Sequence, residues 1–86
     1  MMTKLKMLFK IAKDHETDLI ISMDMNYQIY VSFKDGFIKD GPVLTDIPGR
    51  GESAEEAAID YFDKIYGKEI VFHPNDKDRR RSVYVV

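Results

Sequence analysis

The residue types that carry out catalysis are scarce in this chain, and none lies in a catalytic pattern. The two histidines, His15 and His73, are not at metal-ligand spacing from a carboxylate. Asp60 and Asp63 are the closest approach to a carboxylate pair, but their spacing is typical of exposed helix positions. No serine has the context of a nucleophile elbow. The chain has no cysteine, which excludes disulfides, iron–sulfur clusters and thiolate zinc sites. We therefore expect no enzyme activity, no cofactor and no metal.

Acidic residues in the segment 52–63 form the most prominent candidate binding surface. They are Glu52, Glu55, Glu56, Asp60 and Asp63. An acidic face on a small rigid domain can occupy a basic groove that otherwise holds nucleic acid. An ordinary solvated helix face, with acids favoured near the N-terminus by the helix dipole, fits the same residues. Both interpretations stay open at this point.

Basic residues gather at the two ends of the chain, although its net charge is −2. Residues 1–13 hold four lysines and no acidic residue. The second group is Lys77, Arg79, Arg80 and Arg81. These side chains are candidate contacts for an anion or a nucleic acid. Tyr84 is the only aromatic residue near them, so the stacking platform of a single-strand binder is not evident.

Gly49–Gly51 precedes the start of a helix and could bind an anion through free N–H groups, with Arg50 as a clamp. Three glutamates, at 52, 55 and 56, lie at the same helix end and would repel an anion. The pattern is neither G-x-G-x-x-G nor a Walker loop. The alternative is that the glycines only turn the chain, and the sequence favours it.

The elements that position these residues follow from hydrophobic spacing. Leu5, Leu8, Phe9 and Ala12 recur every three or four residues and predict an amphipathic helix near the N-terminus, capped by Thr3. We expect its apolar face to pack on a sheet. Docking of this basic helix on a membrane or in a partner's groove is the alternative.

The middle of the chain is predicted to form antiparallel strands. The segments 18–24 and 27–34 are apolar or alternate in polarity with period two. Asp35–Gly36 indicates a hairpin to a third strand at 37–39, which Gly41–Pro42 bends or ends. The short connections favour antiparallel pairing.

A second helix is the most clearly marked element. Ser53 and Glu56 form a capping box at its start, and Gly67 follows its end. Strands at 69–73 and 82–86 complete the chain, and the apolar terminal strand is a candidate edge for pairing with a second copy. The predicted fold is a two-layer α+β domain over residues 1–86. It has an antiparallel sheet of about five strands and two helices, in the order α-β-β-β-α-β-β.

Size and composition limit the functional classes. Eighty-six residues suit one domain, and 44% hydrophobic with 33% charged residues argues against global disorder. Lysines interrupt every apolar run near the N-terminus, so no secretory signal is evident. No run approaches the roughly 20 apolar residues of a membrane span. We expect a protein of the bacterial cytoplasm that does not bind membranes.

The segment 51–72, GESAEEAAIDYFDKIYGKEIVF, resembles small phage and prophage proteins. The shared features are a Ser/Thr-x-Glu-Glu-Ala helix start, an Ile-x-Asp-Tyr centre and a Gly-Lys strand start. More distantly, DIPGRGESAEEA at 46–57 is similar to the loop and helix of HicB-type antitoxins. The loop is shorter here, the N-terminal helix is additional, and a separate DNA-binding domain is lacking. The first resemblance implies a small accessory protein that binds a host component, defence nucleases included.

Three functions are compatible with these features. The leading hypothesis is a phage-type protein that inhibits a host protein or protein–nucleic-acid complex, defence or nucleic-acid-handling, through its acidic face. The second is a HicB-like toxin-neutralising or nucleic-acid-binding module that uses the basic groups. The third is a nucleotide-sequestering protein that uses Gly49–Gly51. A homodimer is compatible with each.

Overall fold

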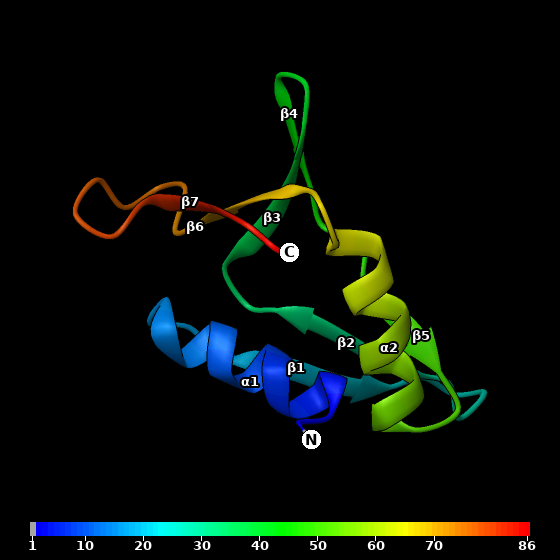
Figure 1. The fold of residues 1–86 in the computed structure, drawn as a ribbon. Coiled ribbons are helices and arrows are strands. Elements are labelled where there is room, and N and C mark those ends of the chain that lie inside the picture. Colours follow the sequence, from blue (N-terminus) through cyan, green and yellow to red (C-terminus); the bar gives the residue numbers. More distant parts are fainter. Residues whose placement is uncertain (1) are drawn as a thin grey trace.

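A computed structural model describes residues 2–86 (Figure 1). Its elements, in chain order, are α1 (Lys4–Asp14), β1 (Leu19–Met23), β2 (Ile29–Phe33), β3 (Gly36–Asp40), β4 (Val43–Thr45), β5 (Gly49–Gly51), α2 (Ala54–Ile65), β6 (Glu69–Phe72) and β7 (Arg81–Tyr84). The α+β class and the two helices are confirmed. The described residues form seven strands rather than about five, because the segment between β3 and α2 contributes β4 and β5.

The strands form two antiparallel sheets rather than one. The first sheet has the order β1-β2-β5, and the second has the order β4-β3-β6-β7. The expected hairpin at Asp35–Gly36 is wrong, since β3 pairs with β4 and β6 and not with β2. A Cβ at Gly36 would lie 2.7 Å from the Cβ of Phe33 and 2.9 Å from the ring of Phe72. This glycine therefore permits a tight passage from one sheet to the other.

The helices cover one face of the first sheet, and the second sheet extends from the end of this layer (Figure 1). The core between them is formed by side chains of both helices and both sheets, chiefly Leu8, Ala12, Val31, Phe33, Ile38, Ala57, Ala58, Tyr61, Phe62, Ile65, Ile70 and Phe72. Phe9, expected on the apolar face of α1, is 46% exposed. Each helical residue advances by about 100°, so Phe9 falls at the edge of the stripe centred on Leu8 and Ala12.

Helix α2 begins and ends where the sequence predicts. The Oγ of Ser53 accepts a hydrogen bond from the N–H of Glu56 at 3.1 Å. The carboxylate of Glu56 accepts the N–H of Glu52 rather than that of Ser53, at 3.0 Å. Tyr66 leaves the helical conformation, and Gly67 follows with φ +74°. These caps fix both ends of the helix.

The sequence favoured a turn of the chain at Gly49 and Gly51, and this prediction is wrong. These glycines form β5, which lies against α2. A Cβ at Gly49 would collide with the carbonyl oxygen of Ala57 and with the backbone N and Cβ of Tyr61. A Cβ at Gly51 would lie 2.7 Å from the backbone N of Ala57. The absence of side chains at these positions lets a strand backbone lie directly on a helix backbone.

Tyr61 joins the same helix to the central strand. Its hydroxyl oxygen accepts a hydrogen bond from the N–H of Phe33 at 3.2 Å, and the two rings pack edge to face at 5.4 Å. Burial raises the pKa of Tyr61 to about 12. The phenol therefore stays neutral and completes the hydrogen bonding of a buried N–H group.

Replacing Gly49 with alanine tests the β5–α2 contact. We expect Gly49→Ala to destabilise the protein by about 3 kcal/mol or more, because the added methyl group forces two backbones apart. Urea denaturation followed by circular dichroism measures the change. Gly41→Asn is the control, since Gly41 has φ +59° and open space around it, and asparagine tolerates that conformation. Equal stability of Gly49→Ala and wild type would contradict the contact.

Candidate protein-binding surface

Two of the five predicted acidic residues are used inside the fold. The carboxylate of Asp60 accepts the N–H of Arg50 at 2.9 Å and pairs with the ammonium of Lys64 at 3.0 Å. The hydrogen bond from Arg50 and then that from Lys64 hold the pKa of Asp60 below its ordinary value. Glu56 accepts the N–H of Glu52. Asp60 and Glu56 thus fasten the segment before α2 to the helix.

The other three acidic residues are Glu52, Glu55 and Asp63. Within residues 2–86, no hydrogen bond or ion pair engages their carboxylates. Glu55, Ile59 and Asp63 are spaced i, i+4, i+8 and form one ridge of the helix surface, and Ile59 is among the exposed large apolar residues. Glu52, three residues before Glu55 and just outside the helix, continues this ridge at its start. We call Glu52, Glu55, Ile59 and Asp63 the acidic ridge.

The anion site considered at Gly49–Gly51 has three of its backbone donors occupied. The N–H of Arg50 is bound to Asp60, that of Glu52 to Glu56, and that of Glu56 to Ser53. The protein's own carboxylates therefore stand where an anion would approach the helix N-terminus. The side chain of Arg50 is exposed on β5, which pairs Arg50 with Tyr30 of β2.

Asp24 organises a polar group that sequence reasoning missed. Its carboxylate accepts the N–H groups of Asn26 and Gln28 at 2.9 and 3.0 Å and the hydroxyl of Tyr30 at 2.8 Å. The Tyr30 hydrogen bond is the main cause that lowers the pKa of Asp24. An aspartate two residues before an asparagine is a turn signal, and this group fixes the β1–β2 turn.

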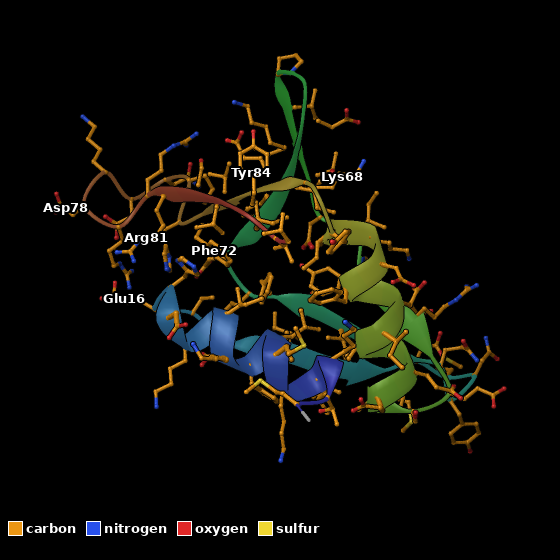
Figure 2. The ribbon with its side chains drawn as sticks, in the orientation of Figure 1. Glu16, Lys68, Phe72, Asp78, Arg81 and Tyr84 are labelled. Carbon is orange, nitrogen blue, oxygen red and sulfur yellow. The ribbon has the colours of Figure 1, made fainter. Side chains whose placement is uncertain are left out.

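The arginines at 79–81 lie in the loop from β6 to β7 and at its end (Figure 2). Arg79 pairs with Asp76 at 2.8 Å, which raises the pKa of Arg79. Arg80 donates to the carbonyl oxygen of Pro74 at 2.9 Å. Arg81 opens β7, and Lys77 is exposed in the loop. Much of this basic group therefore serves to order its own loop.

The basic helix and the arginine loop do not form one uninterrupted patch. Lys10 pairs with Asp14 at 3.0 Å, and Lys4 lies 4.0 Å from the centre of the Phe62 ring. Glu16 follows α1 on the side of the arginine loop (Figure 2), where its charge acts on Arg79. Acidic side chains thus separate the two basic segments.

The two histidines, far apart in the sequence, come together in the structure. His15 stacks on Phe72, with ring centres 4.6 Å apart, and its carbonyl oxygen lies 2.8 Å from Nε2 of His73. His73 is buried, with 6% exposure and φ +51°. Its Nδ1 is 3.8 Å from the carboxylate of Asp35, too far for a hydrogen bond. The arrangement joins the end of α1 to β6.

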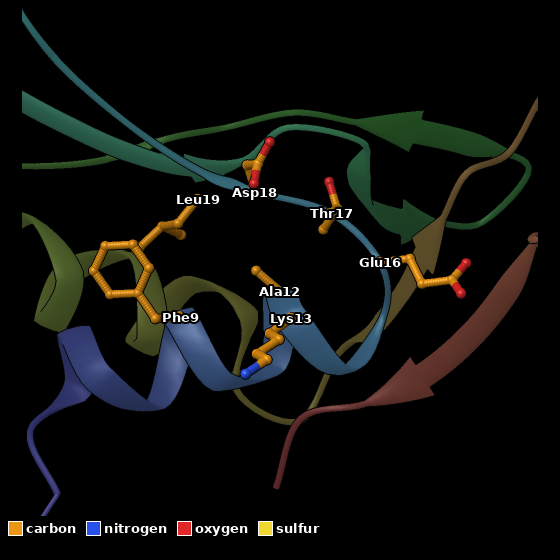
Figure 3. A pocket seen from close by; sticks show the side chains of 7 residues that line it. All are labelled: Phe9, Ala12, Lys13, Glu16, Thr17, Asp18 and Leu19. Atoms are coloured by element: carbon orange, nitrogen blue, oxygen red, sulfur yellow. The ribbon is translucent and has the colours of Figure 1, made fainter.

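Residues 2–86 contain no group of three or more histidines and carboxylates that could hold a metal ion. An open groove lies between α1 and the start of β1 (Figure 3). Its lining is Phe9, Ala12, Lys13, Glu16, Thr17, Asp18 and Leu19. This groove mixes apolar and charged side chains and contains no nucleophile paired with a base.

No protein-family model, curated protein or solved structure matches this chain. No helix within residues 2–86 is long and apolar enough to cross a membrane.

Acid should destabilise the protein through His15. Burial, and next the charge of Arg81, lower the pKa of His15. Below about pH 6.5 the histidine binds a proton more readily in the unfolded chain than in the folded protein. The free energy of unfolding therefore decreases as the pH falls from about 6.5 toward the lowered pKa of His15. His15→Phe keeps the stacking on Phe72 and removes this proton. Urea denaturation at about pH 7.5 and about pH 5.5 should show a smaller loss in His15→Phe than in wild type. Equal losses would contradict the assignment.

Proposed function

We propose that this chain is a binding protein that inhibits a protein of a bacterial host by placing its acidic ridge in a basic groove. The groove is one that otherwise holds nucleic acid. The division of the five acidic residues supports the proposal most strongly. The carboxylates of Glu56 and Asp60 bond within the fold, whereas those of Glu52, Glu55 and Asp63 have no hydrogen-bond or ion-pair partner in residues 2–86. Glu52 and Asp63 are exposed, and Glu55 is half-buried.

A rigid support makes these charges effective. The buried face of α2 comprises Ala57, Ala58, Tyr61, Phe62 and Ile65, and both helix ends are capped. A preorganised surface loses less conformational entropy on binding than a flexible one. Carboxylates on such a surface raise the rate of encounter with a basic partner.

The solvated-face interpretation explains part of the ridge only. The helix dipole favours Glu52 and Glu55 at the start of α2. Asp63 lies in the last turn, where the dipole disfavours a negative charge, and pairs with no lysine. A binding role accounts for all three carboxylates and for the exposed Ile59 between them.

The phage-type segment 51–72 includes α2 and its acidic ridge. Its resemblance to small phage accessory proteins implies a host target, in a defence or nucleic-acid-handling complex. The ridge adds a chemical description of that target, which is a basic surface with an apolar spot for Ile59. Nucleic acid should compete for the same surface.

Charge reversal on the ridge tests the function. The triple variant Glu52→Lys, Glu55→Lys, Asp63→Lys should bind a partner purified from nuclease-treated bacterial lysate at least about 100-fold more weakly than wild type. The purified partner should also bind nucleic acid, and wild type should displace it. The three side chains make no hydrogen bond or ion pair within residues 2–86, so circular dichroism should be unchanged.

A matched variant on the arginine loop, Lys77→Glu with Arg81→Glu, separates the alternatives. It should bind the partner as wild type does. Loss of binding in this variant, with full binding by the ridge variant, would contradict the proposal and favour the basic groups. Nucleic acid recovered alone, with a steep salt dependence, would do the same.

A further inference from the structure

The first sheet ends in an open edge at β1. The carbonyl oxygen of Asp18 accepts the N–H of Lys34, and the N–H of Asp24 donates to the carbonyl oxygen of Gln28. In this antiparallel register, even-numbered residues of β1 therefore bond to β2. The N–H and C=O groups of Leu19, Ile21 and Met23 point to the other side, where no strand in residues 2–86 lies.

Apolar side chains surround this edge. Ile21 is 43% exposed and Met23 is 61% exposed. They share the helix-covered face of the sheet with Leu19, which lines the groove beside Phe9 of α1 (Figure 3). On the opposite face, Ile20 is also exposed. Strand β1 contains no charge, proline or bulge, the usual features that keep an edge from pairing.

We propose that β1 pairs antiparallel with β1 of a second copy of this chain around a two-fold axis. The two three-stranded sheets then join into one, in the order β5-β2-β1-β1-β2-β5. The groove beside α1 of one copy faces that of the other. Leu19, Ile21 and Phe9 of both copies are covered together, which removes the exposed apolar edge from water.

Charge at the ends of β1 selects the register. Three registers are two-fold symmetric and let the odd-numbered residues of the two β1 strands bond to each other. In these registers Ile20, Ile21 or Ser22 lies opposite the same residue of the second copy. With Ile21 at the axis, Asp18 would face Asp24 of the second copy, and like charges directly opposite are destabilising. With Ser22 at the axis, Ile20 would face Asp24 of the second copy.

The register with Ile20 at the axis avoids both conflicts. It places the two Ile20 side chains together on one face and Leu19 against Ile21 of the second copy on the other. Asp18 then faces Ser22 of the second copy, whose hydroxyl can donate to it. Of the three registers, this one makes the apolar strand β1 complementary to itself.

Helix α1 adds electrostatic complementarity across the axis. Lys6, Phe9 and Lys13 are spaced i, i+3, i+7, and Phe9 and Lys13 line the groove. Glu16 lines its other end. Two-fold pairing places the two α1 helices antiparallel. Lys6 near the start of one helix therefore approaches Glu16 of the other copy. A parallel or shifted arrangement of the two copies would lose this attraction between Lys6 and Glu16.

Cysteine crosslinking tests the register, because the chain has no cysteine. Ile20→Cys places two thiols at a non-hydrogen-bonded pair on the axis, at a separation that suits a disulfide. It should crosslink under mild oxidation at least about tenfold faster than Met25→Cys, which is 95% exposed and lies beyond β1. Faster crosslinking of Ile21→Cys or Ser22→Cys than of Ile20→Cys would overturn the register.

Sedimentation equilibrium of the cysteine-free protein tests the dimer itself. Wild type should be a dimer, and Ile21→Lys should be a monomer with an unchanged circular dichroism spectrum. Tyr84→Lys, on the edge strand β7 of the second sheet, is the matched control and should remain a dimer. A monomeric wild type at about 100 μM would overturn the proposal. Dissociation by Tyr84→Lys and not by Ile21→Lys would assign the interface to the terminal strand and overturn it as well.

This interface is distinct from the acidic ridge. Strand β1 is at one edge of the first sheet, and α2 packs on β5 at the other edge (Figure 1). A dimer formed at β1 leaves both ridges open. Loss of dimerisation and loss of partner binding are therefore separable results.

Discussion

The close contact of β5 with α2 is the constraint on which the rest of the structure depends. Two glycines bring a strand backbone against a helix backbone at a distance that no side chain would permit. From that contact, Tyr61 reaches the N–H of Phe33 in the central strand. Helix, edge strand and central strand are thus fastened at one place, and the remaining apolar side chains of α1 and the second sheet pack around it.

The same contact determines which charges are free. Because β5 lies on α2, the N–H of Arg50 comes within reach of Asp60, and that of Glu52 comes within reach of Glu56. Those carboxylates replace the external anion that a glycine-rich helix start would otherwise attract. The carboxylates of Glu52, Glu55 and Asp63 keep no partner in residues 2–86 and lie on a rigid support. A segment typical of phosphate sites in other contexts becomes, in this fold, the support for an acidic surface.

Local patterns predicted the helices, their caps and the α+β class, because helix periodicity and capping depend on residues only a few positions apart. The division into two sheets could not be predicted from local patterns, because it depends on Gly36 fitting between Phe33 and Phe72, which is distant in sequence. The role of Gly49 likewise depends on Ala57 and Tyr61. The contact of His73 with the carbonyl oxygen of His15 and the stacking of His15 on Phe72 leave no local signal either. The sequence names the five acidic residues as a group, and only the fold distinguishes the carboxylates that have no partner in residues 2–86.

Hydrogen exchange of the Phe33 amide in wild type and in Tyr61→Phe tests the central contact most directly. The substitution removes only the hydroxyl that accepts this N–H and leaves the ring in place. We expect slow exchange in wild type and a loss of about 1–3 kcal/mol in protection and in unfolding free energy in the variant, the cost of an unpaired buried donor. Equal protection of the Phe33 amide in the two proteins would show that α2 is not fastened to the central strand in this way.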